Sequence, residues 1–394
     1  MLIVRLDSKI YILIRFPAVM EEWRLIDLGL ADPYMAQTFY DAVALAINRK
    51  ISPNTIILVR PVSPYVCIGY HQELKKEVNI ELCERLGLPI IRRRQGGGAV
   101  YLDSNQQFYQ VIASGESIYI PHNVSELFRR FLEVTVYVCR RLGLNAEFKP
   151  INDVVVNNRK ISGNGASRIG SAVVLVGNVL LDVDYDMMAN ILRVPSEKFR
   201  DKLAKSMRDW ITSLKRELGY IPSDKQLKKL FTEGYEEIIG LNINYGSPSS
   251  EELKIWREEV LPKHKSRDWL YLYDDEREEI ERSVRVADGV RVVEVVHKGK
   301  KLIRVTAETI GDKILDLIIS GDFFIIPEES IERLREKLRG VVMDEAEVKS
   351  RINEFINESK AQLLGLDIND LTSAITKLKE YSEKYPHPYL EAED

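Results

Sequence analysis

The chain has 394 residues, 45% of them hydrophobic and 29% charged, and a formal net charge of −4. This length favours two domains, and the composition is typical of a well-packed globular protein. The small net charge excludes a global attraction to nucleic acid or to an anionic membrane, so any basic site must be local.

The beginning of the chain is apolar, but Arg5, Asp7, Lys9 and Arg15 interrupt its apolar runs. We therefore expect neither a signal peptide nor a membrane span, which needs ~18 apolar residues. The three cysteines form no CxxC pair, which argues against secretion, disulfides and a zinc site. We expect a cytoplasmic protein and assign residues 1–19 to an N-terminal extension, because a cleaner pattern begins after them.

The first part of the chain combines β-branched apolar runs with helical patterns. Strands are expected at 23–29, 55–62, 65–70, both ends of 88–103, and 105–113, and helices at 33–50, 73–87 and 123–143. Only Ser63 and Pro64 separate the runs at 55–62 and 65–70, which indicates two neighbouring strands.

Further strands are expected at 146–149, 153–163 and 171–184, with Asn157-Asn158 as a hairpin turn. From 186 to about 275 the pattern is helical and charged. Several strands or several helices follow one another along the sequence, without the regular alternation of βαβ units. The expected class is therefore α+β, with a mixed, largely antiparallel sheet flanked by helices.

The composition changes near residue 276. The charge-dense segment 274–282 indicates a linker that acts as a hinge. Three strands with glycines at their breaks and a helix from Pro327 to Gly340 follow, and two more helical segments complete a small α+β unit.

The most unusual stretch is RRRQGGGAVYLD, from Arg92 to Asp103. A P-loop is excluded because no Lys-Ser/Thr follows, and a dinucleotide fingerprint is excluded because a strand follows instead of a helix. One reading is a flexible connection. The other is a loop whose backbone N–H groups approach a carboxylate or phosphate beside three arginines, of which one is expected to point to solvent.

A second polar segment follows at 152–168. Asn152 and Asp153 offer oxygens suited to Mg²⁺, although a simple turn is an equal reading. Lys160 is either a solvated strand residue or, together with the glycine loop, the cation for an anionic reacting group.

These motifs in this order, RRxxGGGAVY, Asp103 with Asn105, ND and RKISG, resemble the lipoate–protein ligase family. The resemblance covers roughly residues 20–275. It implies a biotin/lipoate ligase-like fold, similar to class II synthetases, for a catalytic domain at 20–275. Residues 276–394 resemble the accessory domain of these ligases, which supports adenylation and moves between the half-reactions.

The resemblance implies an ATP-dependent enzyme that activates lipoate or octanoate to acyl-AMP, with Mg²⁺, and transfers the acyl group to a lysine of an acceptor protein. Lys160 would be the catalytic cation. Asn152 and Asp153 would hold ATP and the metal, with Asp153 as metal ligand. The acyl-AMP would contact Arg93, Gly96, Gly97, Gly98, Ala99, Val100, Tyr101, Ser162 and Gly163.

Acceptors in the family are lipoyl domains of 2-oxoacid dehydrogenase E2 subunits, glycine cleavage H-like proteins and lipoate-binding proteins. We expect no nucleic acid or membrane partner and a monomer. Four features depart from the family pattern: Gln95 replaces Ser, Leu102 replaces His, the Asp-x-Gly-Asn step is shortened to Asp103-Ser104-Asn105, and Val176 begins VGN where His-Gly-Thr is common.

Three alternatives stay open. The first is an octanoyl or lipoyl transferase between carrier proteins, which uses a cysteine nucleophile. In the related transferases that cysteine follows the lysine motif, and in this chain no cysteine follows Cys139. A biotin ligase usually has alternating Arg and Gly in its glycine-rich signature. A non-catalytic cofactor-binding homologue is the third.

Overall fold

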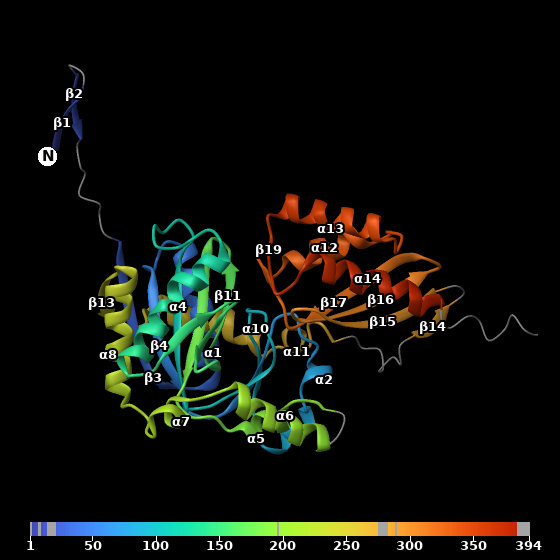
Figure 1. The fold of residues 1–394 in the computed structure, drawn as a ribbon, viewed down its shortest axis with the longest axis horizontal. Coiled ribbons are helices and arrows are strands. Elements are labelled where there is room, and N and C mark those ends of the chain that lie inside the picture. Colours follow the sequence, from blue (N-terminus) through green and yellow to red (C-terminus); the bar gives the residue numbers. More distant parts are fainter. Residues whose placement is uncertain are drawn as a thin grey trace, which may run out of the picture.

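The computed structural model describes residues 2–6, 9–13, 21–194, 197–274, 283–287 and 290–383. Residues 21–274 form a main domain, and residues 283–287 and 290–383 form a small C-terminal domain (Figure 1). β1 (Leu2–Leu6) and β2 (Lys9–Leu13) form a hairpin that Figure 1 shows apart from both domains. Residues 275–282 of the predicted hinge lie outside the described residues.

The main domain is built on an eight-stranded sheet. Its order is β13 (Asn242–Gly246), β3 (Glu22–Ala31), β4 (Thr55–Pro61), β8 (Gln106–Ser114), β12 (Ala172–Leu180), β11 (Arg159–Ile169), β10 (Asp153–Val156) and β9 (Ala146–Lys149). β13 and β4 run parallel to β3, and every other pair is antiparallel. The mixed, largely antiparallel sheet is thus confirmed.

Helices cover both faces of this sheet, because its strands alternate apolar residues between the two sides. Leu25 and Ile56 face a core formed with α4 (Val124–Arg141) and α8 (Asp224–Gly234). Ile26 and Ile57 face a second core formed with α1 (Pro33–Asn48). Asp32 caps α1 by accepting hydrogen bonds from two backbone N–H groups, and Pro33 follows at the first helical position.

A three-stranded sheet, β6 (Ile90–Arg92), β5 (Tyr65–Ile68) and β7 (Val100–Leu102), carries the glycine loop between β6 and β7. The prediction that 55–62 and 65–70 form neighbouring strands is wrong. β4 lies in the large sheet and β5 in this smaller one, because Pro61 to Pro64 turn the chain between them.

Short helices complete the main domain. The predicted helix at 73–87 is broken into α2 (Leu74–Glu77) and α3 (Ile80–Arg85), since Val78 is extended and Asn79 caps α3. The others are α5 (Tyr185–Ile191), α6 (Glu197–Trp210), α7 (Leu214–Leu218), η1 (Tyr235–Ile239), α9 (Ser250–Ile255), η2 (Trp256–Val260), α10 (Leu261–Lys265) and α11 (Arg267–Leu270). No helix in the described ranges is long and apolar enough to cross a membrane.

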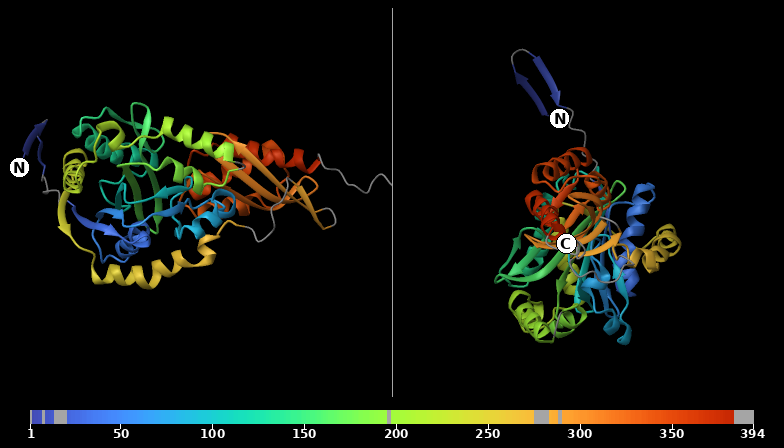
Figure 2. Two further views of the ribbon diagram at one scale, coloured as in Figure 1. Left: turned by 90° about the horizontal axis from the view of Figure 1, so that it is seen from below. Right: turned by 90° about the vertical axis from the view of Figure 1, so that its right-hand side faces the viewer.

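The C-terminal domain has an antiparallel sheet, β14 (Ser283–Ala287), β15 (Val290–Lys298), β16 (Leu302–Ile310) and β17 (Lys313–Gly321). α12 (Ser330–Leu338) and α14 (Ile368–Glu383) pack against this sheet, and α13 (Glu345–Ser359) packs against both of these helices. β18 (Phe324–Ile326) pairs with β19 (Gln362–Leu364). Figures 1 and 2 show the domain against one end of the main domain.

The two domains share their apolar cores. Phe324, Ile326 and Leu364 belong to the core around α4, whereas Tyr70 and Trp269 of the main domain belong to the core of the C-terminal domain. Backbone hydrogen bonds also join the domains, including one from the Gly321 N–H to the His71 carbonyl.

Charged groups at the domain contact are buried and paired. Arg304 lies 3.4 Å from Glu73 and 3.2 Å from Glu77 across the contact. Glu328 lies 3.6 Å from Arg94 and accepts a 3.4 Å hydrogen bond from the Arg168 N–H. Burial raises the pKa of Glu328 to about 8, although Arg94 opposes that shift.

Candidate active site

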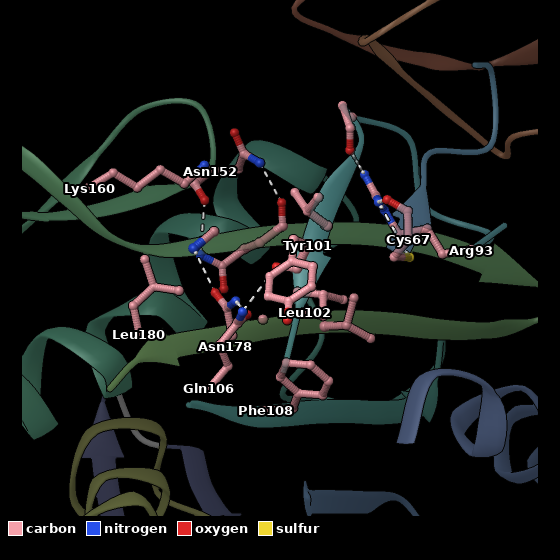
Figure 3. Close-up of a pocket in the computed structure, with 18 of the residues that line it drawn as sticks. Cys67, Arg93, Tyr101, Leu102, Gln106, Phe108, Asn152, Lys160, Asn178 and Leu180 are labelled. Carbon is pink, nitrogen blue, oxygen red and sulfur yellow. Dashed lines mark hydrogen bonds between the residues drawn. The ribbon is translucent and has the colours of Figure 1, made fainter. Parts of the chain in front are cut away.

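A cavity of about 330 Å³ lies between the glycine loop and the strands β11 and β12 (Figure 3). Its volume is within the range of small-molecule sites. It is lined by Gln37, Cys67, Arg93, Gly96, Gly97, Gly98, Val100, Tyr101, Leu102, Asp103, Gln106, Phe108, Gln110, Asn152, Lys160, Gly163, Asn164, Gly165, Val176, Gly177, Asn178, Leu180, Asp182, Val183, Asp184, Met188, Ile211, Lys301 and Phe324.

The three glycines of the loop meet different neighbours. A Cβ on Gly96 would collide with the Phe323 carbonyl of the C-terminal domain. Gly97 has φ +88°, a left-handed conformation that favours glycine. A Cβ on Gly98 would meet no atom within 4 Å, although Gly98 lines the cavity. Of the three, Gly98 is therefore the glycine that leaves open space for a ligand.

The three arginines before the loop all point into the protein. Arg92 is fully buried and donates to several backbone carbonyls, Tyr70 and Leu270 among them. Arg93 donates to the carbonyls of Gly96 (2.7 Å) and Gly98 (2.9 Å), and so fixes the glycine loop. The expectation that one of them points to solvent is wrong, because Arg94 also has a buried partner, Asp41.

Lys160 lies at one side of the cavity beside Asn152, and Cys67 and Arg93 lie at the other (Figure 3). The Lys160 ammonium is 2.7 Å from the Asp153 carboxylate, and its side chain is 38% exposed. Asn152 is held in place by reciprocal hydrogen bonds with Asn164. An ammonium in this position can contact an anionic group that enters the cavity.

A hydrogen-bond chain shapes the polar part of the cavity. The Gly163 N–H donates to Asn178 Oδ1 (3.1 Å), Asn178 Nδ2 donates to Gln106 Oε1 (2.6 Å), and Gln106 Nε2 donates to the Tyr101 carbonyl (3.1 Å). This chain joins β11, β12, β8 and β7, and therefore fixes the backbone on both sides of the cavity (Figure 3).

Three carboxylates, Asp103, Asp182 and Asp184, also line the cavity. Burial raises the pKa of Asp103, and the charges of Asp184 and Asp182 add to this effect, although hydrogen bonds from Asn105 oppose it. The apolar part of the lining comes from Val100, Leu102, Phe108, Val176, Leu180, Val183 and Met188. The cavity thus suits a ligand with one apolar and one anionic or polar part.

Most of the predicted site residues lie together in this cavity. Nine line it: Lys160, Arg93, Gly96, Gly97, Gly98, Val100, Tyr101, Asn152 and Gly163. Three do not line it. Ala99 is buried in a neighbouring apolar cluster, Ser162 is buried against the Tyr109 hydroxyl at 3.1 Å, and Asp153 is paired with Lys160.

Several lining residues were not predicted. Lys301 and Phe324 come from the C-terminal domain, and no local pattern marks them. Leu102 and Val176, two departures from the family pattern, also line the cavity, so these substitutions alter its shape directly. Gln95 lies behind the loop, where Tyr40 and Ser167 hydrogen-bond to it at 2.9 Å.

The three thiols are buried, and burial raises the pKa of each of them. Cys83 and Cys139 lie outside the cavity lining. Cys67 lines it, with Arg93 Nη1 3.6 Å from its Sγ. These thiols are therefore protonated at neutral pH, which is unfavourable for a nucleophile.

The described residues provide little of a metal site by themselves. No group of three His, Cys, Asp or Glu residues in the described ranges could hold a metal ion. Asp153 is already paired with Lys160. The roles predicted for Asn152 and Asp153 toward Mg²⁺ therefore stay a prediction, in which the other ligands would be phosphate oxygens.

Comparison with known protein families shows to which family this chain is related. The model of the lipoyl protein ligase A/B catalytic domain matches residues 32–236. The chain belongs to this family. As a family member it is 28% identical over 274 residues to the octanoyltransferase LipM of Kyrpidia tusciae, a match that covers 64% of this chain and 99% of that relative. It is also 28% identical over 214 residues to lipoate-protein ligase A subunit 1 of Thermoplasma acidophilum, covering 52% and 79%.

Solved structures agree with the fold of this lipoyl ligase family member. A bipartite lipoate protein ligase from Thermoplasma acidophilum matches with a TM-score of 0.56 and 28% identity, covering 66% of this chain and all of that one. LipL1 of P. falciparum, solved in complex with lipoate, matches with a TM-score of 0.64, covering 90% of this chain and 99% of that one. Its identity is 15%, so this match shows the fold alone.

Proposed function

We propose that this chain is an ATP-dependent lipoate–protein ligase, with residues 20–275 as catalytic domain and 276–394 as accessory domain. The observation that carries the proposal is the chemistry around Lys160: a cation faces the cavity, and no cysteine in the described ranges is placed beside it as an exposed thiolate. Adenylation activates a carboxylate without any protein nucleophile, and therefore fits such a site.

In the first half-reaction, a carboxylate oxygen of lipoate or octanoate attacks the α-phosphorus of ATP. A C–O–P bond forms, and pyrophosphate leaves. Negative charge develops on the oxygens around phosphorus, where a fixed ammonium such as Lys160 stabilises the transition state. Mg²⁺, carried in with ATP, would neutralise phosphate charge.

In the second half-reaction, the ε-amine of the acceptor lysine attacks the acyl carbonyl. The amide forms, AMP leaves, and the attacking nitrogen loses a proton. Lys160 would again contact the oxygens that gain charge. Acceptors of this kind are supported by the Thermoplasma acidophilum ligase, whose structure was determined in a study of that enzyme and its E2 lipoyl domain.

The backbone holds the acyl substrate in this proposal. Gly98 leaves the space, Val100 and Tyr101 continue the wall on β7, and Leu102, Phe108 and Val176 supply apolar surface for the tail. The C-terminal domain covers the glycine loop and adds Lys301 and Phe324 to the cavity, which limits the access of water to a labile acyl-AMP.

The second candidate is an octanoyltransferase that moves the acyl group between carrier proteins. It is favoured by the similarity to LipM, which spans almost the whole of that enzyme. That match leaves about a third of this chain uncovered, and Cys67, which lines the cavity, is buried with a raised pKa. The ligase is therefore our preferred proposal.

Pyrophosphate release separates the two candidates without an acceptor protein. The ligase releases pyrophosphate from ATP only when lipoate or octanoate is present. A transferase releases none, whatever acid is added, and this result would overturn the proposed function.

A further inference from the structure

The cavity is closed at the end far from Lys160 by the C-terminal domain. Gly165 follows Lys160 by five residues on β11, and both line the cavity. At about 3.3 Å per strand residue, these two positions lie roughly 16 Å apart. Lys160 and Asn152 lie at one end, whereas the guanidinium of Arg93 at the other end already donates to the carbonyls of Gly96 and Gly98. Lys160 is therefore the cation that is placed for a carboxylate, and the far end is left for the acyl tail.

The ring of Phe324 forms the wall at this far end. A Cβ on Gly97 would lie 3.1 Å from its Cζ, and a Cβ on Gly165 would lie 3.6 Å from its Cε1. The ring is therefore in van der Waals reach of both glycine backbones. It is 3% exposed and belongs to the core of the main domain, although it comes from β18.

We infer that Phe324 sets the longest acyl chain that this enzyme accepts. The inference rests on the proposed function, because that function places the carboxylate at Lys160 and the tail at the opposite end. A smaller side chain at position 324 opens space beyond the wall, and a larger one shortens the cavity. The C-terminal domain is then part of the acyl-binding site as well as its cover.

The size of the effect follows from burial of methylene groups. Each additional methylene that becomes buried improves binding about fourfold, because one buried CH₂ is worth ~0.8 kcal/mol. Opening the wall by two methylenes therefore favours the longer acid by roughly fifteenfold over the wild-type preference. Phe324→Trp should reverse the direction and favour shorter acids.

The test is the relative kcat/KM for straight-chain acids from hexanoate to myristate, measured as pyrophosphate release by the full chain. Phe324→Ala should move the optimum to longer acids and Phe324→Trp to shorter ones. Opposite shifts cannot arise from a general loss of stability, which lowers all rates together. Ile326→Ala is the matched control, because Ile326 lies on the same strand and in the same core but does not line the cavity.

An unchanged chain-length profile in both Phe324 variants, with an active wild-type enzyme, would overturn the inference and leave the proposed function intact. The same shift in Ile326→Ala would also overturn it, because the effect would then follow from docking of the domain. A wild-type chain that shows no acid-dependent release overturns the proposed function instead. Isothermal titration of the same acids then reports the chain-length preference directly, and equal affinities in wild type and Phe324→Ala would overturn the inference.

Discussion

The backbone N–H of Gly97 donates a hydrogen bond to the carbonyl of Phe323, with 3.3 Å between N and O. The two residues lie in different domains, so the glycine loop is a docking element as well as part of the cavity wall. Backbone that must pass this close to another backbone cannot carry a Cβ, which explains Gly96 without any ligand. No protein atom lies close enough to explain why residue 98 is a glycine, so we attribute this glycine to the ligand that enters the cavity.

Substitution of Gly98 and Gly96 should separate these two roles. Gly98→Ala meets no protein atom, so the fold should be unchanged, while KM for the acyl substrate rises roughly tenfold through a clash of about 1–3 kcal/mol. Gly96→Ala collides with the Phe323 carbonyl and should loosen the domain contact. Steady-state kinetics and limited proteolysis measure the two effects, and equal protease resistance of both variants would contradict the assignment.

Lys160→Ala should reduce acyl transfer by roughly 10²–10³-fold, because a fixed charge near the developing oxyanion is lost. Lys229→Ala is the control, since Lys229 is an exposed lysine on α8 that pairs with Glu233. Kinetics with saturating acid and ATP compare the two variants. Unaltered activity and substrate affinity in Lys160→Ala would instead favour a non-catalytic homologue.

The domain contact should depend on pH through Glu328. Its pKa is raised from the usual 4.5 to about 8 when the domains are docked, so the docked state favours the protonated carboxyl. Its contribution to docking is fully present below about pH 4.5 and is lost as the pH rises through about 8. Glu328→Gln should remove this part of the pH dependence, as measured by protease protection of the contact between pH 5 and ~8.5. The same pH profile in wild type and variant would contradict the assignment.

No acyl-thioester should form on the enzyme. The raised pKa of Cys67 keeps its thiol protonated, and Cys83 and Cys139 lie outside the cavity lining. The mass of the chain should therefore stay unchanged after incubation with an octanoyl-carrier protein. A hydroxylamine-sensitive gain of one octanoyl group that Cys67→Ala abolishes would favour the transferase.

The local sequence predicts much of the fold. β-branched runs mark most strands, Asp32 and Asn123 mark the caps of α1 and α4, and Asn157 and Asn158 adopt positive φ in the expected turn. The sequence did not predict β13, because this strand at the edge of the sheet is mostly exposed and shows no alternation of apolar and polar residues. Its pairing with β3 is a long-range contact that no local pattern encodes.

The candidate site was predictable where its residues lie within a local motif, as the glycines do in one segment and Asn152 and Lys160 do in another. It was not predictable where partners come from distant segments. Arg92 is buried because carbonyls near residues 70 and 270 surround its guanidinium, and Phe324 reaches the cavity from the other domain. Such contacts depend on how distant segments and the two domains pack together. The periodicity of apolar residues and the spacing of motifs in the sequence carry no information about this packing.

The most direct test of the central claim is intact-mass analysis of a lipoyl-acceptor domain incubated with this chain, octanoate or lipoate, and Mg²⁺, with and without ATP. The account predicts a gain of one acyl group only when ATP is present, and loss of that gain in Lys160→Ala. Acylation without ATP from an octanoyl-carrier donor, with none from free acid and ATP, would contradict the account and establish the transferase.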